Sequence, residues 1–187
     1  MDKLTVRRVA AALGVQAPAL YWHFESKRAL LDYMTEAMLA PVAKKLAQPG
    51  VGEPWWPWVE HSVEAVRAGL LAHRDGGRVA LGADLRRARA LGTFADRVTE
   101  VLHGAGFGLA DASRAAGALT HFVVGRVVEE QARPNPDTEG DIPFPTLGAA
   151  MRERHAAGTT PDDDFHYSLD IMITGLRTLR NRLPRRT

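Results

Sequence analysis

The chain has 187 residues, of which 45% are apolar and 25% are charged, and its formal net charge at pH 7 is +2. This is the composition of a globular protein of one or two small domains with an apolar core of its own. Because the chain has no cysteine, disulfides, thiolate nucleophiles and cysteine-ligated zinc are excluded. No stretch approaches the roughly 20 apolar residues of a membrane span, and the first residues form no apolar signal region, so we expect a cytoplasmic protein without membrane association.

Basic side chains are concentrated at the two ends of the chain. The first thirty residues hold Lys3, Arg7, Arg8, Lys27 and Arg28 against two acidic residues, and five arginines lie in residues 177–186. A basic end on a nearly neutral protein is typical of a nucleic-acid surface. A solvated helix face with a frayed tail accounts for the same charges equally well.

The first predicted elements are two short helices joined by a tight turn. Apolar residues from Val6 to Leu13 repeat at three and four residues, the period of a helix, and Gly14 ends that helix. A second helix follows from about Ala17, and Ser26 is a typical N-cap for a third helix that begins at Lys27. Two helices in this relation predict a helix-turn-helix, in which the second helix enters the major groove of DNA.

The residue types of the second helix support this interpretation. Small residues at positions 17–19 allow the backbone to approach the bases and can contact thymine methyl groups, whereas Tyr21, His23 and Lys27 can reach phosphates. The alternative is a plain helical corner in a bundle. Such a corner does not need aromatic and basic side chains side by side, so the sequence favours a DNA-reading unit.

Helical spacing continues through the rest of the chain. The apolar residues of segments 59–70, 91–101 and 169–183 repeat at three and four residues. The strand-like run 122–128 lies between Ala-rich and Glu/Gln-rich flanks, so we interpret it as buried helix. The predicted fold class is therefore all-α.

Connections and caps divide these helices. Segments 48–57 and 134–145 are rich in proline and glycine and are predicted to connect helices, the second as a long loop. Thr160, followed by Pro161 and three aspartates, predicts a capped helix start with acidic residues in its first turn. We interpret these aspartates as helix-start residues rather than as a metal site.

Residues 20–24, Leu-Tyr-Trp-His-Phe, followed by Ser26-Lys27-Arg28, resemble the hallmark of the tetracycline-repressor (TetR) family. The resemblance continues through His-Arg-Asp-Gly at residues 73–76 to about residue 131. It implies a homodimeric, all-α repressor with two DNA-reading heads beneath ligand-binding cores that dimerise through a four-helix bundle. A small molecule would release the operator DNA. The domains expected on this basis are a head, residues 1–46, and an effector-binding and dimerisation domain, residues 47–187.

The resemblance also implies residue roles in the head. Family members carry a further amphipathic helix before the position of Leu4, where this chain has three residues, so the resemblance predicts an incomplete head. The residues expected to contact DNA are Thr5, Arg7, Gln16, Ala17, Pro18, Ala19, Tyr21, Trp22, His23 and Lys27.

In the core, the resemblance implies an effector cavity with altered chemistry. The position that supplies a histidine ligand to magnesium in the drug-binding relatives is Ala80 here, and a methyl group cannot coordinate a metal. We therefore expect no metal and no cofactor, and a small apolar or polycyclic effector. The residues expected to bind it are Trp58, Ser62, Val66, Ala80, Leu81, Phe94, Val98, Ala116, His121, Glu129 and Met172.

Several other patterns favour no specific chemistry. The chain's histidines occur in no tight metal-ligand spacing, and we interpret His121 as a hydrogen-bonded core residue. The glycines at 104, 106 and 108 follow no predicted strand, so they do not predict a dinucleotide site. The tryptophans at 55, 56 and 58 either line the effector cavity or cover the outside of the bundle.

Two alternatives to a ligand-responsive repressor remain at this point. An all-α enzyme could use the same cavity, although the sequence shows no nucleophile–base pair. A small-molecule sensor or interaction protein could dimerise without holding DNA if the head is incomplete.

Overall fold

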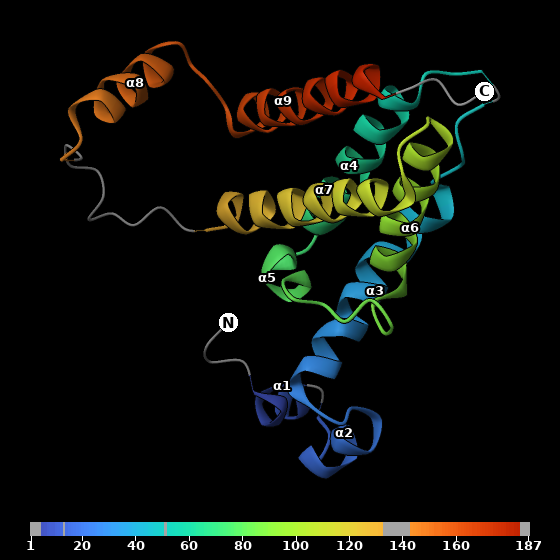
Figure 1. The fold of residues 1–187 in the computed structure, drawn as a ribbon. Helices are drawn as coiled ribbons and strands as arrows, with labels where there is room; N and C mark the ends of the chain where they lie inside the picture. The colour runs from blue at the N-terminus through green and yellow to red at the C-terminus, as the bar shows by residue number, and fades with distance from the viewer. Residues whose placement is uncertain (1–4, 13, 51, 133–142, 184–187) are drawn as a thin grey trace.

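The computed structural model describes residues 5–12, 14–50, 52–132 and 143–183, and over these residues it contains helices and loops but no strand (Figure 1). The all-α prediction is confirmed. None of the described helices is both long and apolar enough to cross a membrane. The helices are α1 (Val6–Ala12), α2 (Ala17–His23), α3 (Lys27–Lys45), α4 (Trp55–Leu71), α5 (Gly76–Ala80), α6 (Arg89–Gly104), α7 (Leu109–Glu130), α8 (Pro145–Ala156) and α9 (Pro161–Arg182).

The first two helices begin and end where the local chemistry predicts. Thr5 accepts the backbone N–H of Arg8 at 3.2 Å, which caps α1. Gly14 has a φ of +68°, a left-handed conformation that glycine adopts without a Cβ clash, and it turns the chain into α2. The hydroxyl of Ser26 accepts the N–H of Ala29 at 3.1 Å, so the predicted N-cap of α3 is confirmed.

Helix α3 connects the two parts of the molecule. It rises from the α1–α2 pair into the helical body and packs there against α4, α5 and α6 (Figure 1). Pro41 lies inside it. At its far end the guanidinium of Arg97 on α6 donates to the carbonyls of Ala43 and Leu46, which satisfies acceptors that the end of a helix leaves unpaired.

The core forms where α4, α6 and α7 meet. Val63 on α4, Phe94 on α6 and Leu119 on α7 are each no more than 1% exposed. The strand-like run 122–128 is part of α7, and Val123 and Val127 are buried there, so its interpretation as buried helix is confirmed. Such burial of aliphatic and aromatic side chains is the main source of stability for a domain of this size.

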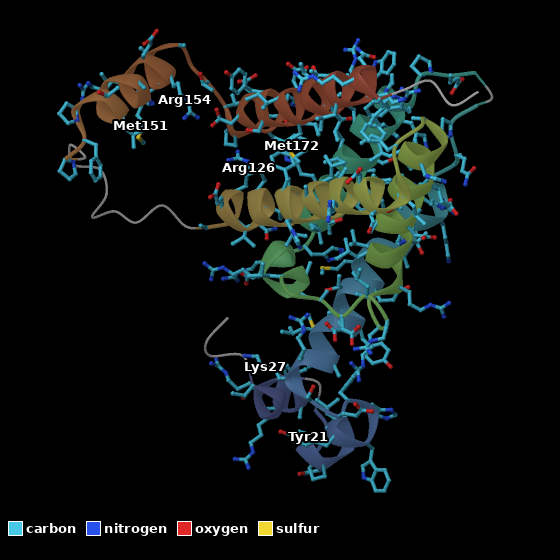
Figure 2. All side chains as sticks on the ribbon, in the orientation of Figure 1. Tyr21, Lys27, Arg126, Met151, Arg154 and Met172 are labelled. Atoms are coloured by element: carbon cyan, nitrogen blue, oxygen red, sulfur yellow. The ribbon has the colours of Figure 1, made fainter. Side chains whose placement is uncertain are left out.

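Helix α9 lies along α7 and covers one of its sides (Figure 1). The rings of Phe165 on α9 and Phe122 on α7 stack with their centroids 5.4 Å apart, and Met172 is placed between the two helices (Figure 2). Thr160 and Asp163 cap each other's backbone N–H groups at the start of α9, as the sequence predicts.

Helix α8 was not predicted as a separate element, and it extends away from the helical body (Figure 1). The predicted loop 134–145 lies mostly outside the described residues, and α8 begins at its last residue. Phe144, Leu147 and Met151 are each about half exposed or more. The other predicted connection, 48–57, is shorter than expected because α4 already begins at Trp55.

Ionisable groups join α4 to α9. The ring of His166 on α9 has its Nδ1 2.9 Å from the carbonyl oxygen of Asp162 and its Nε2 3.2 Å from Glu64 on α4. Both partners are acceptors, so the doubly protonated ring satisfies both contacts. The backbone hydrogen bond with Asp162, together with the charges of Asp162 and Glu64, raises the pKa of His166 above its ordinary 6.5. Burial, with the nearby charges of Glu64 and Asp170, likewise raises the pKa of Glu60.

These groups predict that the free energy of unfolding depends on pH. Because the folded-state pKa of His166 lies above 6.5, its contribution is complete below pH 6.5 and disappears as the pH rises through the folded-state value. We expect the urea midpoint of the native chain, at one fixed protein concentration, to fall between pH 6 and pH 8.5. The His166→Gln variant should show a smaller fall.

The control is His155→Gln, which removes an exposed histidine on α8. It should keep the pH dependence of the native chain. An equal fall in the native chain and in His166→Gln would mean that His166 does not carry the effect.

Candidate functional site

The first candidate site is the exposed surface of α1 and α2. Among the described residues, their shared core contains the buried Ala10 and Leu20, with Val9 and Phe24 packed against them. The ring of Phe24 also meets that of Tyr33 on α3, with centroids 5.6 Å apart. The α1–α2 pair therefore packs against the start of α3, and its outer surface is exposed to solvent.

The described side chains expected to contact DNA lie on that outer surface. Tyr21 is 53% exposed and Trp22 89% exposed, and Tyr21 and Lys27 lie at the end of the molecule remote from α7 and α9 (Figure 2). Ala17 is the first residue of α2. The remaining members of the set are all exposed: Thr5, Arg7, Gln16, Pro18, Ala19, His23 and Lys27. This surface therefore presents two neighbouring aromatic side chains beside basic residues.

The second candidate site is an apolar cavity of about 420 Å³ in the body of the molecule. This volume falls in the usual range for small-molecule sites. One wall is the segment from α5 to α6, and the other is a face of α7. The lining residues are Ala80, Leu81, Gly82, Ala83, Leu85, Leu91, Ala95, Gly117, Thr120, His121 and Val124.

Three of the residues expected to bind an effector line this cavity, namely Ala80, Leu81 and His121. The interpretation of His121 as a core residue is wrong, because its side chain is exposed. It lies on the cavity side of α7, one turn from Gly117 and Val124 in either direction.

The other expected residues lie elsewhere, and their part in effector binding stays a prediction. Five of them are buried in the core: Ser62, Val66, Phe94, Val98 and Ala116. The hydroxyl of Ser62 donates to the carbonyl of Trp58 at 2.7 Å, so it is already paired. Trp58 and Met172 are partly buried, and Glu129 is exposed.

Apart from His121, the sequence interpretation missed the residues of the α7 wall, although their spacing carried a signal. Gly117, Thr120, His121 and Val124 recur at three and four residues and therefore share one face of α7. The small residues on this face leave room that larger side chains would fill. A Cβ added to Gly117 would meet no atom within 4 Å.

The tryptophans of α4 cover the end of the bundle rather than line this cavity. Trp55 packs edge-on against Phe107, and the guanidinium of Arg177 lies 4.5 Å from the ring centre of Trp56. The indole N–H of Trp58 donates to the carbonyl of Ala47. The structure therefore fits the interpretation that these tryptophans cover the outside of the bundle.

A second hollow, of about 580 Å³, lies among α7, α8 and α9. Its lining is charged, with Arg126 from α7, Arg154 from α8, and Asp163 and Asp164 from α9 (Figure 2). Arg154 and Asp164 form an ion pair. An apolar ligand fits the cavity beside α5 better than this hollow. Among the described residues, no three histidine or acidic side chains are placed to hold a metal ion.

One arginine connects the cavity wall to the helix that carries the exposed surface. The guanidinium of Arg28 in the first turn of α3 donates to the carbonyls of Leu81 and Val79, at 2.8 and 3.0 Å, and to Asp32 at 2.8 Å. Asp32 is fully buried, and it also accepts the backbone N–H of Asp84 at 3.1 Å. The segment from residue 79 to residue 84 is therefore hydrogen-bonded directly to α3.

The opposite end of α5 is fixed to α7. The N–H of Gly77 donates to the side chain of Gln131 at 3.0 Å, and Gln131 also donates to the carbonyl of His73 at 2.9 Å. A Cβ at Gly77 would lie 2.7 Å from the backbone nitrogen of Val128, which is closer than atoms pack. Only glycine permits this approach of α5 to α7.

Comparison with protein families assigns the two parts of the chain to one group. Residues 1–34 match the family described as bacterial regulatory proteins, tetR family. Residues 48–180 match the tetracyclin repressor-like C-terminal domain.

Individual relatives are similar to this chain over nearly its whole length. The tetracycline repressor protein class C of Escherichia coli is 37% identical, over 96% of this chain and 84% of that protein. A possible TetR family transcriptional regulator from Streptomyces coelicolor A3(2) superposes with a TM-score of 0.76 at 36% identity, over 96% of this chain and 91% of the other. A TetR variant from Acinetobacter baumannii AYE, solved in complex with minocycline, superposes with a TM-score of 0.70 at 35% identity, over 96% and 88% of the two chains.

The cavity beside α5 predicts that a substitution can fill it without unfolding the protein. Gly117→Leu places an apolar side chain in the open space, and replacing a helical glycine stabilises the helix by up to about 1 kcal/mol. We expect the variant to bind 1-anilinonaphthalene-8-sulfonate, an anionic dye whose aromatic rings bind apolar cavities, at least tenfold more weakly, measured by fluorescence titration, with no loss of thermal stability. EDTA should not change either affinity.

Gly104→Leu is the matched control, because Gly104 is equally open but lies at the end of α6 and outside this cavity. It should bind the dye as the native chain does. Equal dye affinity in Gly117→Leu and the native chain would show that the dye does not use this cavity.

Proposed function

The chain belongs to the TetR family of transcriptional regulators, and we propose that it is a ligand-responsive repressor that binds a palindromic operator as a homodimer. The family is not enzymatic, so the chain is a regulator rather than an enzyme. The observation that carries the proposal is the Arg28 contact, because it bonds the wall of an apolar cavity to the helix that bears the exposed α1–α2 surface.

In this proposal residues 1–46 form the DNA-reading head, and residues 47–187 bind the effector and dimerise. The exposed side of α2 would lie in the major groove, where positions 17–19 approach the bases. Tyr21, His23 and Lys27 would contact phosphates, and their exposure supports that role. Since it acts on DNA, the protein would work in the cytoplasm.

Release of DNA follows from a shift between two arrangements of the dimer. A ligand that fills the cavity pushes on the segment 80–85, and Arg28 passes that displacement to α3 and so to the head. The two heads of the dimer would then no longer match adjacent major grooves. Such a ligand acts through its higher affinity for one arrangement, and no chemical step is needed.

The lining of the cavity favours an apolar or polycyclic effector bound without metal. Alanine, glycine, leucine and valine make up most of it, and the hydroxyl of Thr120 already donates to the carbonyl of Ala116. The methyl side chain of Ala80 offers no lone pair to a cation. One relative was solved with minocycline, and the cavity here suits a ligand of that size with fewer polar groups.

Dimerisation would use the outward faces of α9 and α7. Tyr167, Ile171 and Leu179 lie on α9 and are each more than half exposed, although large apolar side chains usually find cover in a folded protein. Two copies related by a two-fold axis would bury these side chains against each other. The exposed apolar side chains of α8, which reaches beyond the body, would be covered by the second copy as well.

The first prediction from this proposal concerns DNA. The native chain should retard DNA from the intergenic region upstream of its own gene, with an affinity that falls steeply as salt is raised. Lys27→Ala and Tyr21→Ala should each weaken binding about tenfold on every sequence, because a contact to a charged phosphate is lost. A larger residue at Ala17 should instead change which sequence is preferred.

Lys44→Ala is the control, because Lys44 is exposed at the opposite end of α3. It should bind as the native chain does and keep the same salt dependence. If the native chain dimerises but retards no DNA, the repressor proposal is wrong and a small-molecule sensor or interaction protein takes its place.

The second prediction concerns assembly. Leu176, on the last helix, packs partly against the chain's own core, so Ile171 is the sharper test of an interface. Ile171→Glu should raise the dimer dissociation constant at least a hundredfold, because burying a carboxylate without a partner costs several kcal/mol. Sedimentation velocity at micromolar concentration measures the change.

Ala68→Glu places the same charge on the exposed side of α4 and should leave the dimer intact. If the native chain sediments as a monomer, or if both variants remain dimeric, the proposed interface is wrong.

A further inference from the structure

Arg87 lies in the segment between α5 and α6, which forms one wall of the cavity, and it contacts the head directly. Its guanidinium is 3.0 Å from the carboxylate of Glu25, which lies in the turn between α2 and α3. The same guanidinium is 3.3 Å from Asp84, which is bonded through its N–H to Asp32. Arg87 is therefore a polar contact between the head and the segment that lines the cavity, separate from the bonds of Arg28.

We propose that Arg87 is a positioning residue that holds the DNA-reading head to the cavity wall through Glu25, and that it exchanges this partner for Asp32 when the wall moves. The inference rests on the proposed function, since it describes how the effector cavity is connected to the head. It concerns the orientation of the head and not the contacts that the head makes with DNA.

The partner exchange follows from the state of Asp32. Its Oδ1 accepts from Arg28 and from the N–H of Asp84, whereas its Oδ2 is buried and accepts no hydrogen bond from any described residue. An unpaired buried carboxylate oxygen is unfavourable. The nearest guanidinium nitrogen of Arg87 is 4.0 Å from Oδ2, so a movement of about 1 Å brings it into hydrogen-bond range.

The arrangement in which Arg87 pairs with Glu25 and the one in which it pairs with Asp32 are close in free energy, so a bound ligand can shift the equilibrium between them. In the structure Arg87 pairs with Glu25, whose side chain is 85% exposed, and an exposed ion pair contributes little. In the other arrangement Arg87 satisfies the buried Oδ2 of Asp32 on α3 and releases Glu25, which lies next to α2. A small displacement of the wall by a bound ligand is then sufficient to change the partner.

Arg86 provides a comparison within the same segment. Its guanidinium pairs with Asp84 at 3.0 Å and is 90% exposed. It has the same charge and the same neighbour as Arg87, but its hydrogen bonds are all to Asp84 and involve neither Glu25 nor Asp32. Removing its charge therefore tests for a general effect of arginine in this segment.

The experiment measures the orientation of the head without DNA. Because the chain has no cysteine, Trp22→Cys on α2 and Asp96→Cys on α6, both exposed positions, accept one spin label each. Labelled chains are diluted into unlabelled chains so that a dimer holds one labelled copy. Electron–electron double resonance at 50 mM salt then gives the distribution of the head-to-core distance.

We expect a narrow distribution in the native background and a broader one in both Glu25→Gln and Arg87→Gln. The double variant should be no broader than either single one, because the two changes remove the same contact. Arg86→Gln should stay narrow. Raising the salt to 1 M should broaden the native distribution toward that of Glu25→Gln, since an exposed ion pair is screened.

A second readout uses unlabelled chains and the upstream intergenic DNA. Glu25→Gln and Arg87→Gln should each change the DNA dissociation constant about twofold to fivefold in the same direction, and the double variant should change it no further. Glu25 is almost fully exposed, so Glu25→Gln folds even if Arg87→Gln does not.

Two results overturn the proposal: a distribution that stays narrow in Glu25→Gln, or one that broadens equally in Arg86→Gln. If the native chain retards no DNA but the distance distributions change as expected, the repressor function fails and the contact between head and wall stands. The distances thus separate the failure of this inference from the failure of the proposed function.

Discussion

The hydrogen bonds of the Arg28 side chain fix the position of the cavity wall relative to α3, and the rest of the molecule depends on this constraint. One guanidinium in the first turn of α3 satisfies the carbonyls of Val79 and Leu81 together with the buried carboxylate of Asp32. A carboxylate this deep in the protein is tolerated only when it is paired, so the cluster holds α3 and the cavity wall in one relative position. The head stands on α3, the cavity opens beside the wall, and each is placed by the same few atoms.

The core supports this arrangement by keeping α7 fixed. Val63, Phe94 and Leu119 are packed from three helices around one centre, and α9 covers the remaining side of α7 through the stacked rings of Phe122 and Phe165. A close-packed interior transmits displacement rather than absorbing it. The segment from α5 to α6 therefore has room to move, because it borders the cavity on one side and the Arg28 cluster on the other.

Local chemistry made much of this fold predictable from the sequence. Gly14, Ser26 and Thr160 act through atoms within three or four residues, so the turn and both helix starts could be read directly. The cavity could not be read from local spacing, because its walls, residues 80–95 and 117–124, belong to different helices and meet only through tertiary packing. His121 shows the difference: its spacing fits an apolar helix face, but the space that this face borders is empty, and the side chain is exposed.

The contact of Gly77 with α7 has a mechanical consequence. This end of α5 is held against the backbone of Val128 and the side chain of Gln131, whereas the chain leaves α5 at Leu81, whose side chain is 56% exposed and whose carbonyl accepts from Arg28. If a ligand pushes on the cavity wall, we therefore expect α5 to rotate about Gly77 rather than shift as a whole. The displacement would then be smallest beside α7 and largest at Leu81, so that Gly77 would act as the pivot of a lever.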